Sequence, residues 1–192
     1  MTNILQLARN IEPCQRNWDT SVEIPSAHID YVTQACTAVP TKQNKNIYGL
    51  VVVQDRTIIE QLYHMSKEDA DSNINFNKNS QVLANVLLIW TDGPYKSKYI
   101  SDVDLAIGIS SATAALAASE LGYVTGFCKC FVETEIQHIL HSAGVDQYNK
   151  PRLMLGFGVP HSQYHRRVVV QPDGTACHKR SYSKQPIPIR HI

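Results

Sequence analysis

The chain has 192 residues, which is enough for one domain with a sizeable core. Its formal net charge of +1 gives no bulk attraction to nucleic acid or to an anionic membrane. The first residues lack the basic segment and apolar core of a signal peptide. The five cysteines are odd in number and irregularly spaced, which argues against a disulfide framework. We therefore expect one domain over residues 1–192, in a reducing, cytoplasmic setting.

Helical and strand patterns alternate through the first half of the chain. The patterns predict helices at residues 2–10, 27–39 and 57–66, and strands at residues 48–54 and in the latter half of 82–90. Ser26 is the expected N-cap of the second helix, whose buried face would carry Ile29, Val32, Cys36 and Val39. A turn at residues 91–94 is expected to end the second strand.

The second half is expected to begin with a long helix of small residues. Ser101 and Asp104 resemble a capping box at its start, and Gly122 is suited to its C-terminal end. Its uncharged stretch, residues 105–119, is too short and too rich in Ser and Thr for a membrane span. Further elements are predicted as a strand at 123–131, a helix at 133–142, a strand at 153–159 and an extended basic arm over the last thirty residues. The expected class is α+β, with a mixed sheet surrounded by helices.

A polar loop at residues 40–46 separates an amphipathic helix from a buried strand. It carries a proline, a hydroxyl, three amides and two amines. Polar side chains on a loop beside a rigid element commonly bind ligands, although an ordinary polar turn has the same composition. Further segments of interest are residues 12–19, 76–80, 121–131, 155–160 and 179–180.

The order and spacing of these segments resemble the nitroreductase family of FMN-dependent oxidoreductases, over about residues 12–180. The family carries an Arg-x-Ser-x-Arg/Lys-x-Phe segment, in which Arg16 matches the second basic position and Trp18 the aromatic one. Glu12 and Cys14 stand where the family has a phosphate-binding Arg and a Ser. These departures change the expected phosphate contact, for which Arg9 is a candidate replacement.

The resemblance also implies roles for the other segments. The loop at 40–48 matches Pro-Ser-x-x-Asn-x-Gln-x-Trp and would reach the flavin of a partner subunit, in an interlocked homodimer. Asn77 would bond the pyrimidine edge of the ring, and the backbone N–H groups of Lys129 and Cys130 would point at flavin N5. The implied cofactor site consists of Cys14, Arg16, Thr41, Asn44, Asn46, Asn77, Ser80, Lys129, Cys130, Lys179 and Arg180.

The implied reaction is hydride transfer from NAD(P)H through flavin N5 to a nitroaromatic, a quinone or an enone. The catalytic residues would be Arg16, Lys129 and Cys130, with Arg16 favouring the reduced flavin. No G-x-G-x-x-G loop is present, so NAD(P)H would stack over the flavin rather than bind a Rossmann domain. The alternatives are a specialised relative, such as a reductive dehalogenase or a flavin-fragmenting enzyme, and a flavin-binding protein without turnover. No metal site is expected, because His161 and His165 lack a second ligand pair at zinc-finger spacing.

Overall fold

The computed structural model describes residues 3–64, 80–146, 150–163, 168–170 and 176–178, together with Pro188 and Arg190. The α-helices are α1 (Ile4–Ile11), α2 (Ser26–Thr37), α3 (Arg56–His64), α4 (Ile100–Glu120) and α5 (Glu133–Ser142), and the 3-10 helices are η1 (Lys42–Asn44) and η2 (Ser80–Leu83). The strands are β1 (Tyr48–Val53), β2 (Val86–Asp92), β3 (Val124–Cys128), β4 (Pro151–Gly158), β5 (Val168–Val170) and β6 (Ala176–His178). The predicted helices and strands are therefore present, with shifts of up to three residues at their ends. The predicted extended arm over the last thirty residues lies largely outside the described residues, and its described part includes β5 and β6.

The central sheet has four strands in the order β1-β2-β4-β3. Every pairing within it is antiparallel, and β5 and β6 form a separate antiparallel pair. The α+β class is confirmed. The expected mixed sheet is not found in the described part of the chain, where no parallel pair occurs. Local sequence patterns indicate that a strand is buried, but they do not give its direction relative to its neighbours.

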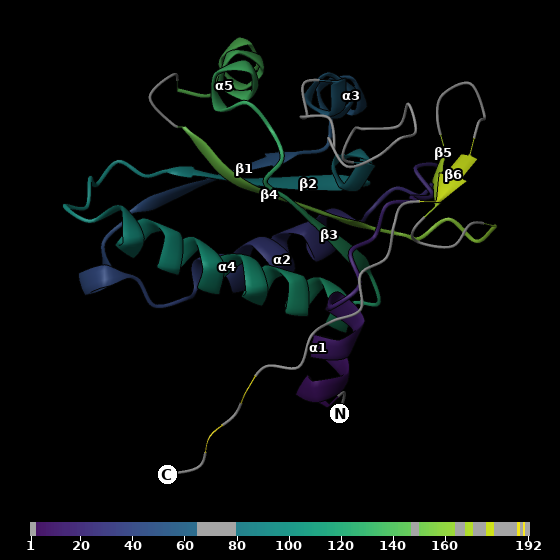
Figure 1. Ribbon diagram of the computed structural model, residues 1–192, viewed down its shortest axis with the longest axis horizontal. Helices are drawn as coiled ribbons and strands as arrows, with labels where there is room; N and C mark the ends of the chain where they lie inside the picture. The colour runs from purple at the N-terminus through teal and green to yellow at the C-terminus, as the bar shows by residue number, and fades with distance from the viewer. Residues whose placement is uncertain are drawn as a thin grey trace.

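Helices cover both faces of the sheet. Figure 1 shows α2 and α4 on one face and α3 and α5 on the other, with α1 beyond α4. The central strand β2 is buried on both sides, and its side chains alternate between two hydrophobic cores because successive strand residues point to opposite faces. Val86, Leu88 and Trp90 join the core under α2 and α4. Leu87 and Ile89 join the core under α3 and α5.

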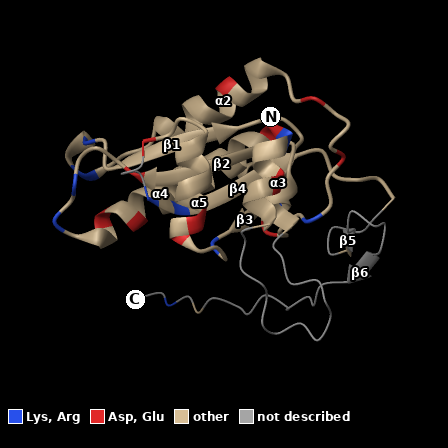
Figure 2. Ribbon diagram, turned by 90° about the horizontal axis from the view of Figure 1, so that it is seen from above, with Lys and Arg blue, Asp and Glu red and all other residues tan. Residues whose placement is uncertain are grey.

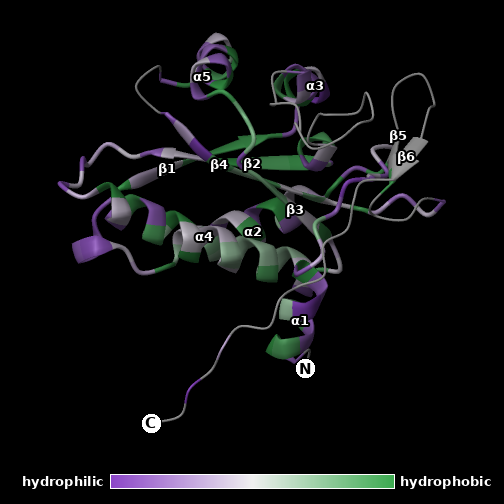
Figure 3. Ribbon diagram, viewed as in Figure 1, coloured by the Kyte–Doolittle hydropathy of each residue, from purple (hydrophilic) through white to green (hydrophobic). Residues whose placement is uncertain are grey.

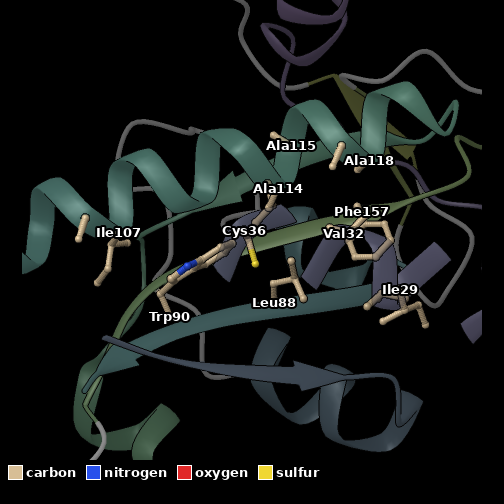
Figure 4. Close-up of a cluster of buried hydrophobic side chains, with 14 of the residues drawn as sticks. Ile29, Val32, Cys36, Leu88, Trp90, Ile107, Ala114, Ala115, Ala118 and Phe157 are labelled. Atoms are coloured by element: carbon tan, nitrogen blue, oxygen red, sulfur yellow. The ribbon is translucent and has the colours of Figure 1, made fainter. Parts of the chain in front are cut away.

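The core under α4 depends on its small residues. Ala114, Ala115 and Ala118 are buried and lie against the side of the sheet that carries Leu88, Trp90 and Phe157. Figure 4 shows side chains of α2, Ile29, Val32 and Cys36, in the same cluster. The predicted buried face of α2 is thus confirmed for these three residues. The small faces of α4 allow it to approach the sheet and α2 closely, as the sequence pattern predicts.

A buried polar junction joins four elements within this core. The Ser110 hydroxyl on α4 donates a hydrogen bond to the Cys36 carbonyl oxygen at 2.6 Å and accepts one from Trp90 Nε1 at 2.8 Å. The Tyr48 hydroxyl donates to the same carbonyl at 2.9 Å. This carbonyl lies in the last turn of α2, where it has no partner within the helix. The junction therefore fixes the end of α2, from which the loop at residues 38–47 departs.

The ends of two helices differ from the sequence prediction. Helix α2 begins at Ser26 itself, with Pro25 as the N-cap. Helix α4 begins at Ile100 with Tyr99 as the N-cap, and no side chain caps it. The predicted Ser101–Asp104 capping box is therefore wrong, because Ser97 precedes the helix and its hydroxyl bonds Asp102 at 2.7 Å.

The C-terminal end of α4 is a Schellman motif. Gly122 has a φ of +86°, and its N–H bonds the Ser119 carbonyl while the Tyr123 N–H bonds the Ala118 carbonyl. Among the described residues, α4 has the length and apolar composition of one membrane-crossing helix, a test that a core helix also passes. Because α4 packs between α1, α2 and the sheet, we describe it as a core helix. The expectation that Gly122 terminates it is confirmed.

Charge and hydropathy are distributed as this layered arrangement requires. Figure 2 shows charged residues in loops and on the helices, with the middle of the sheet free of them. Figure 3 shows apolar residues along the strands and on α4.

Candidate functional site

Arg16 is held beside the rim of the sheet by contacts with η2. Its Nη1 donates a hydrogen bond to Gln81 Oε1 at 2.8 Å. Two residues along the chain, Trp18 Nε1 donates to the Ser80 carbonyl oxygen at 2.9 Å. Trp18, Ser80 and Gln81 are buried, and Arg16 is partly buried. The predicted cofactor residues Arg16 and Ser80 therefore lie close together. Trp18, which matches the aromatic position of the family segment, lies beside them.

Two glycines make room for this arrangement in the sheet. Gly126 of β3 pairs directly with Gly156 of β4. A Cβ at Gly126 would lie 2.6 Å from the Gln15 carbonyl oxygen, and a Cβ at Gly156 would lie 2.2 Å from the Gln81 carbonyl oxygen. An isolated glycine inside a strand often marks such a close approach. The Gln15 N–H also bonds the Thr125 carbonyl at 2.8 Å, so residues 14–18 and η2 both pack on the end of the sheet.

Three thiols surround the end of β3. The partly buried Cys14 thiol lies 3.6 Å from the Phe127 carbonyl oxygen. Burial raises the pKa of Cys128 to about 12, against the smaller opposing effects of the Cys130 backbone N–H and the Arg16 charge. Cys130 is exposed and lies just after β3, which ends at Cys128 rather than at residue 131 as expected. Lys129 and Cys130 are therefore outside the strand ladder, beside the segment that carries Cys14 and Arg16.

The loop that carries Thr41, Asn44 and Asn46 is folded tightly. The Thr41 hydroxyl bonds the Lys45 carbonyl at 2.9 Å, and the Asn46 carbonyl accepts from the Tyr95 N–H at 3.1 Å. Gln43 and Asn44 have φ values of +55° and +53°, a left-handed conformation that asparagine tolerates and that is strained for glutamine. Backbone strain of this kind is common at ligand-binding loops. Thr41, Asn44 and Asn46 line a cavity of about 360 Å³. The other residues that line it are Thr37, Ala38, Val39, Lys45, Tyr48 and Leu50.

The predicted site residues therefore form two groups within one chain. The first group, at the end of β3, contains Cys14, Arg16, Ser80, Lys129 and Cys130. The second group is the loop at residues 41–46, which lies against the first half of α4 and carries the Lys42–Asp102 ion pair of 3.9 Å. The first group is thus built on β3, η2 and the segment before Trp18, and the second on the loop beside Asp102 and Leu105 of α4. The remaining predicted residues, Asn77, Lys179 and Arg180, lie outside the described part of the chain.

Sequence reasoning missed Gln81 and Gln15, two buried glutamines that hold the first group together. Gln81 bonds the Arg16 guanidinium, and the Gln15 side chain donates to the Asn17 carbonyl oxygen. The glycines at 126 and 156 are the signal that could have drawn attention to them. Among the described residues, no group of three or more His, Cys, Asp or Glu could hold a metal ion.

Comparison with known proteins gives matches in structure but not in sequence. No protein-family model matches the chain, and no curated protein matches it. A nitroreductase with bound FMN from Bacteroides fragilis superposes with a TM-score of 0.70 at 16% identity, over 100% of both chains. The chain has the nitroreductase fold.

Two further structures support this nitroreductase fold. Oxidized iodotyrosine deiodinase bound to FMN and 3-iodo-L-tyrosine matches with a TM-score of 0.69 at 15% identity, over 98% of both chains. A nitroreductase family protein from Clostridium novyi matches with a TM-score of 0.68 at 14% identity, over 84% of this chain and 87% of that one. The nitroreductase architecture expected from the sequence is thereby confirmed. At these identities the likeness concerns the fold.

Proposed function

We propose that the chain is an FMN-dependent oxidoreductase that transfers a hydride from NAD(P)H to a nitroaromatic, quinone or enone acceptor. The observation that carries this proposal is the Arg16 cation, which Gln81 holds beside the middle of β3 in a nitroreductase fold. The same fold holds FMN in the Bacteroides fragilis structure and in the deiodinase structure. The proposal covers residues 1–192 as one FMN-binding domain.

The residues of the first group fit the polar edge of a flavin ring. A flavin ring needs hydrogen-bond donors along its pyrimidine edge and a cation near the atoms that gain negative charge on reduction. Arg16 supplies the cation. Ser80 lies beside it, since its backbone carbonyl accepts the hydrogen bond from Trp18 Nε1 at 2.9 Å.

The phosphate end of the site differs from the family pattern. Glu12 stands at the position of the family's phosphate-binding Arg, and it is exposed to solvent. Lys179 and Arg180 are the basic residues that we propose for the phosphate, since a dianion is bound most strongly by Arg and Lys.

FMN, when bound, would accept a hydride at N5 and pass it to the acceptor, and the protein would orient the ring and adjust its electrostatics. Arg16 would stabilise the reduced flavin, which carries more negative charge than the oxidised flavin. Lys129 and Cys130 would act through backbone N–H groups, because both lie beyond the end of the β3 ladder. The Cys128 thiol would take no part, since burial keeps its pKa at about 12 and hence keeps it protonated.

We further propose that two copies of the chain form an interlocked homodimer. Tyr99, Ile100 and Leu105, at the start of α4, are 56%, 58% and 66% exposed. Leu105 also borders an apolar cavity of about 300 Å³, whose other lining residues are Pro40, Thr41, Lys42, Asp102, Ala106 and Ile109. Exposed apolar residues next to a preformed hollow are typical of an interaction surface.

A dimer would also unite the two groups of site residues. Within one chain, the loop at residues 41–46 contacts the first half of α4, while Arg16 contacts η2. A partner chain packed on the start of α4 could bring its own loop to the Arg16 group. Sedimentation velocity of the FMN-loaded protein tests this directly, since a monomer that binds FMN tightly would contradict the proposed dimer.

The reaction itself is tested by anaerobic reduction. The FMN-loaded protein should lose its absorbance near the flavin maximum when NADH or NADPH is added, and should regain it when a nitroaromatic or quinone follows. A binding protein without turnover would keep the oxidised spectrum with both nicotinamides.

A second candidate function is reductive dehalogenation. The deiodinase matches the chain with a TM-score of 0.69, against 0.70 for the nitroreductase from Bacteroides fragilis, so the fold does not separate them. An acceptor panel that includes halogenated phenols beside nitroaromatics and quinones would do so. Release of halide by the reduced protein would favour the second candidate.

A further inference from the structure

We propose that Gln81 is a positioning residue, which fixes the Arg16 guanidinium so that its charge acts on the reduction potential of the bound flavin. This inference rests on the proposed function. Gln81 Oε1 accepts the hydrogen bond from Arg16 Nη1 at 2.8 Å. An arginine side chain has several rotatable bonds and loses considerable entropy when it is held in one place. A neutral acceptor that is itself fixed can hold it without cancelling its charge.

Gln81 is fixed by the sheet itself. It is 5% exposed, and its backbone carbonyl lies against Gly156, where a Cβ would come within 2.2 Å. Its own Cβ and Cγ lie against Gly126, where a Cβ would come within 3.0 Å of both. Because Gly126 and Gly156 are direct partners in the β3–β4 ladder, both contacts are made at one point of the sheet. Gln81 therefore has little freedom to move away from Arg16.

The chemical type of residue 81 matters for the charge. The amide is neutral, so the Arg16–Gln81 pair keeps a net charge of +1. A glutamate at the same position would form an ion pair with Arg16 and remove that net charge from the flavin edge. A glutamine at this position therefore orients the cation and adds no opposing charge of its own.

The test is the midpoint potential of bound FMN, measured by anaerobic dye equilibration in wild type and variants. Arg16→Ala should weaken the binding of reduced relative to oxidised FMN about tenfold, which lowers the potential by about 30 mV for a two-electron couple. Gln81→Glu should lower the potential at least as much. Gln81→Met removes the acceptor and keeps the length, and should lower the relative affinity about threefold.

The double variant distinguishes positioning from a direct or purely structural effect. In the Arg16→Ala background, Gln81→Met should leave the potential unchanged, because there is no guanidinium left to orient. Ser111→Ala is the control, since it removes a buried hydroxyl whose hydrogen bond stays within α4, and it should not shift the potential. Melting temperature and FMN occupancy are recorded for each variant to confirm that it is folded and loaded.

Two results would overturn the inference. One is an unchanged potential in Gln81→Met and Gln81→Glu while Arg16→Ala shifts it. The other is an equal effect of Gln81→Met with and without Arg16. Failure of the proposed function is a separate outcome, in which the wild-type protein does not bind FMN at all.

Discussion

The buried hydroxyl of Ser110 offers a quantitative test of the core that supports the site. Ser110→Ala removes a donor to the Cys36 carbonyl and an acceptor for Trp90 Nε1–H. The Cys36 carbonyl keeps the Tyr48 hydroxyl at 2.9 Å and is not left unpaired. Among the described residues, the Trp90 N–H has no second acceptor, and Trp90 is fully buried.

The expected loss of stability follows from these two bonds. Leaving the buried indole N–H unsatisfied costs about 1–3 kcal/mol, and a lost neutral hydrogen bond to Cys36 about 0.5–1.5 kcal/mol. We therefore expect Ser110→Ala to lower the free energy of unfolding by about 2–3 kcal/mol. Ser111→Ala is the control, because the Ser111 hydroxyl bonds the Gly108 carbonyl of its own helix at 3.2 Å. Its loss should cost less than about 0.5 kcal/mol.

Urea unfolding, monitored by circular dichroism without added FMN, measures both variants. The slope with urea should stay constant while the midpoint of Ser110→Ala falls. In a Trp90→Phe background the cost of Ser110→Ala should shrink by about 1 kcal/mol or more, since no indole N–H remains to be left unpaired. If Ser110→Ala and Ser111→Ala destabilise the protein equally, the junction does not stabilise the end of α2 as argued here.

Three further predictions concern the loop and the thiols. Gln43→Gly should raise the free energy of unfolding by about 1 kcal/mol, measured by urea unfolding, because the left-handed φ of +55° is no longer strained. Burial raises the pKa of Cys36 to about 11 and of Cys128 to about 12. Because these pKa values are raised, the stability that they contribute is present below about pH 8.5 and is lost toward pH 11–12. Unfolding at pH 8.5–11 should show this decline, and Cys128→Ala should make it shallower. Cys130→Ala should keep most NAD(P)H-driven turnover, while Cys130→Pro should lose it because proline has no N–H; loss in Cys130→Ala with FMN still bound would assign the chemistry to the thiol.

The spacing of apolar residues predicted the helices and strands well where that spacing alone decides which side of the element is buried. The helix at Glu133–Ser142 matches its prediction at both ends, and β1 differs from its own by one residue. The small residues of α4 correctly indicated a buried helix. In each case the spacing of apolar residues indicates which face of the element is buried, and that face packs in the hydrophobic core.

The prediction failed where the outcome depends on groups distant in sequence. The start of α4 depends on Ser97, which bonds Asp102 from outside the helix and displaces the expected Ser101–Asp104 box. Strand direction depends on the whole chain path, so the antiparallel sheet could not be read from local patterns. Gln81 escaped notice because its role depends on Gly126 and Gly156, which belong to two other strands.

The candidate site was predictable only in part for the same reason. Arg16 and Ser80 are 64 positions apart along the chain, and their proximity follows from the Trp18–Ser80 and Arg16–Gln81 bonds. The motif order led to both residues, but the geometry that joins them is a property of the fold. Whether Thr41, Asn44 and Asn46 complete the same site stays a prediction, because it requires a second chain.

The most direct test of this account is an FMN titration of the purified, flavin-free protein, with the absorbance spectrum and the melting temperature as readouts. We expect a perturbed flavin spectrum and a stabilisation of about 2.7 kcal/mol when free FMN reaches a hundred times its Kd. Arg16→Ala should bind FMN more weakly, and the Lys129→Ala variant, whose backbone N–H is retained, should bind as wild type does. A wild-type protein whose spectrum and melting temperature do not respond to FMN would contradict the central claim.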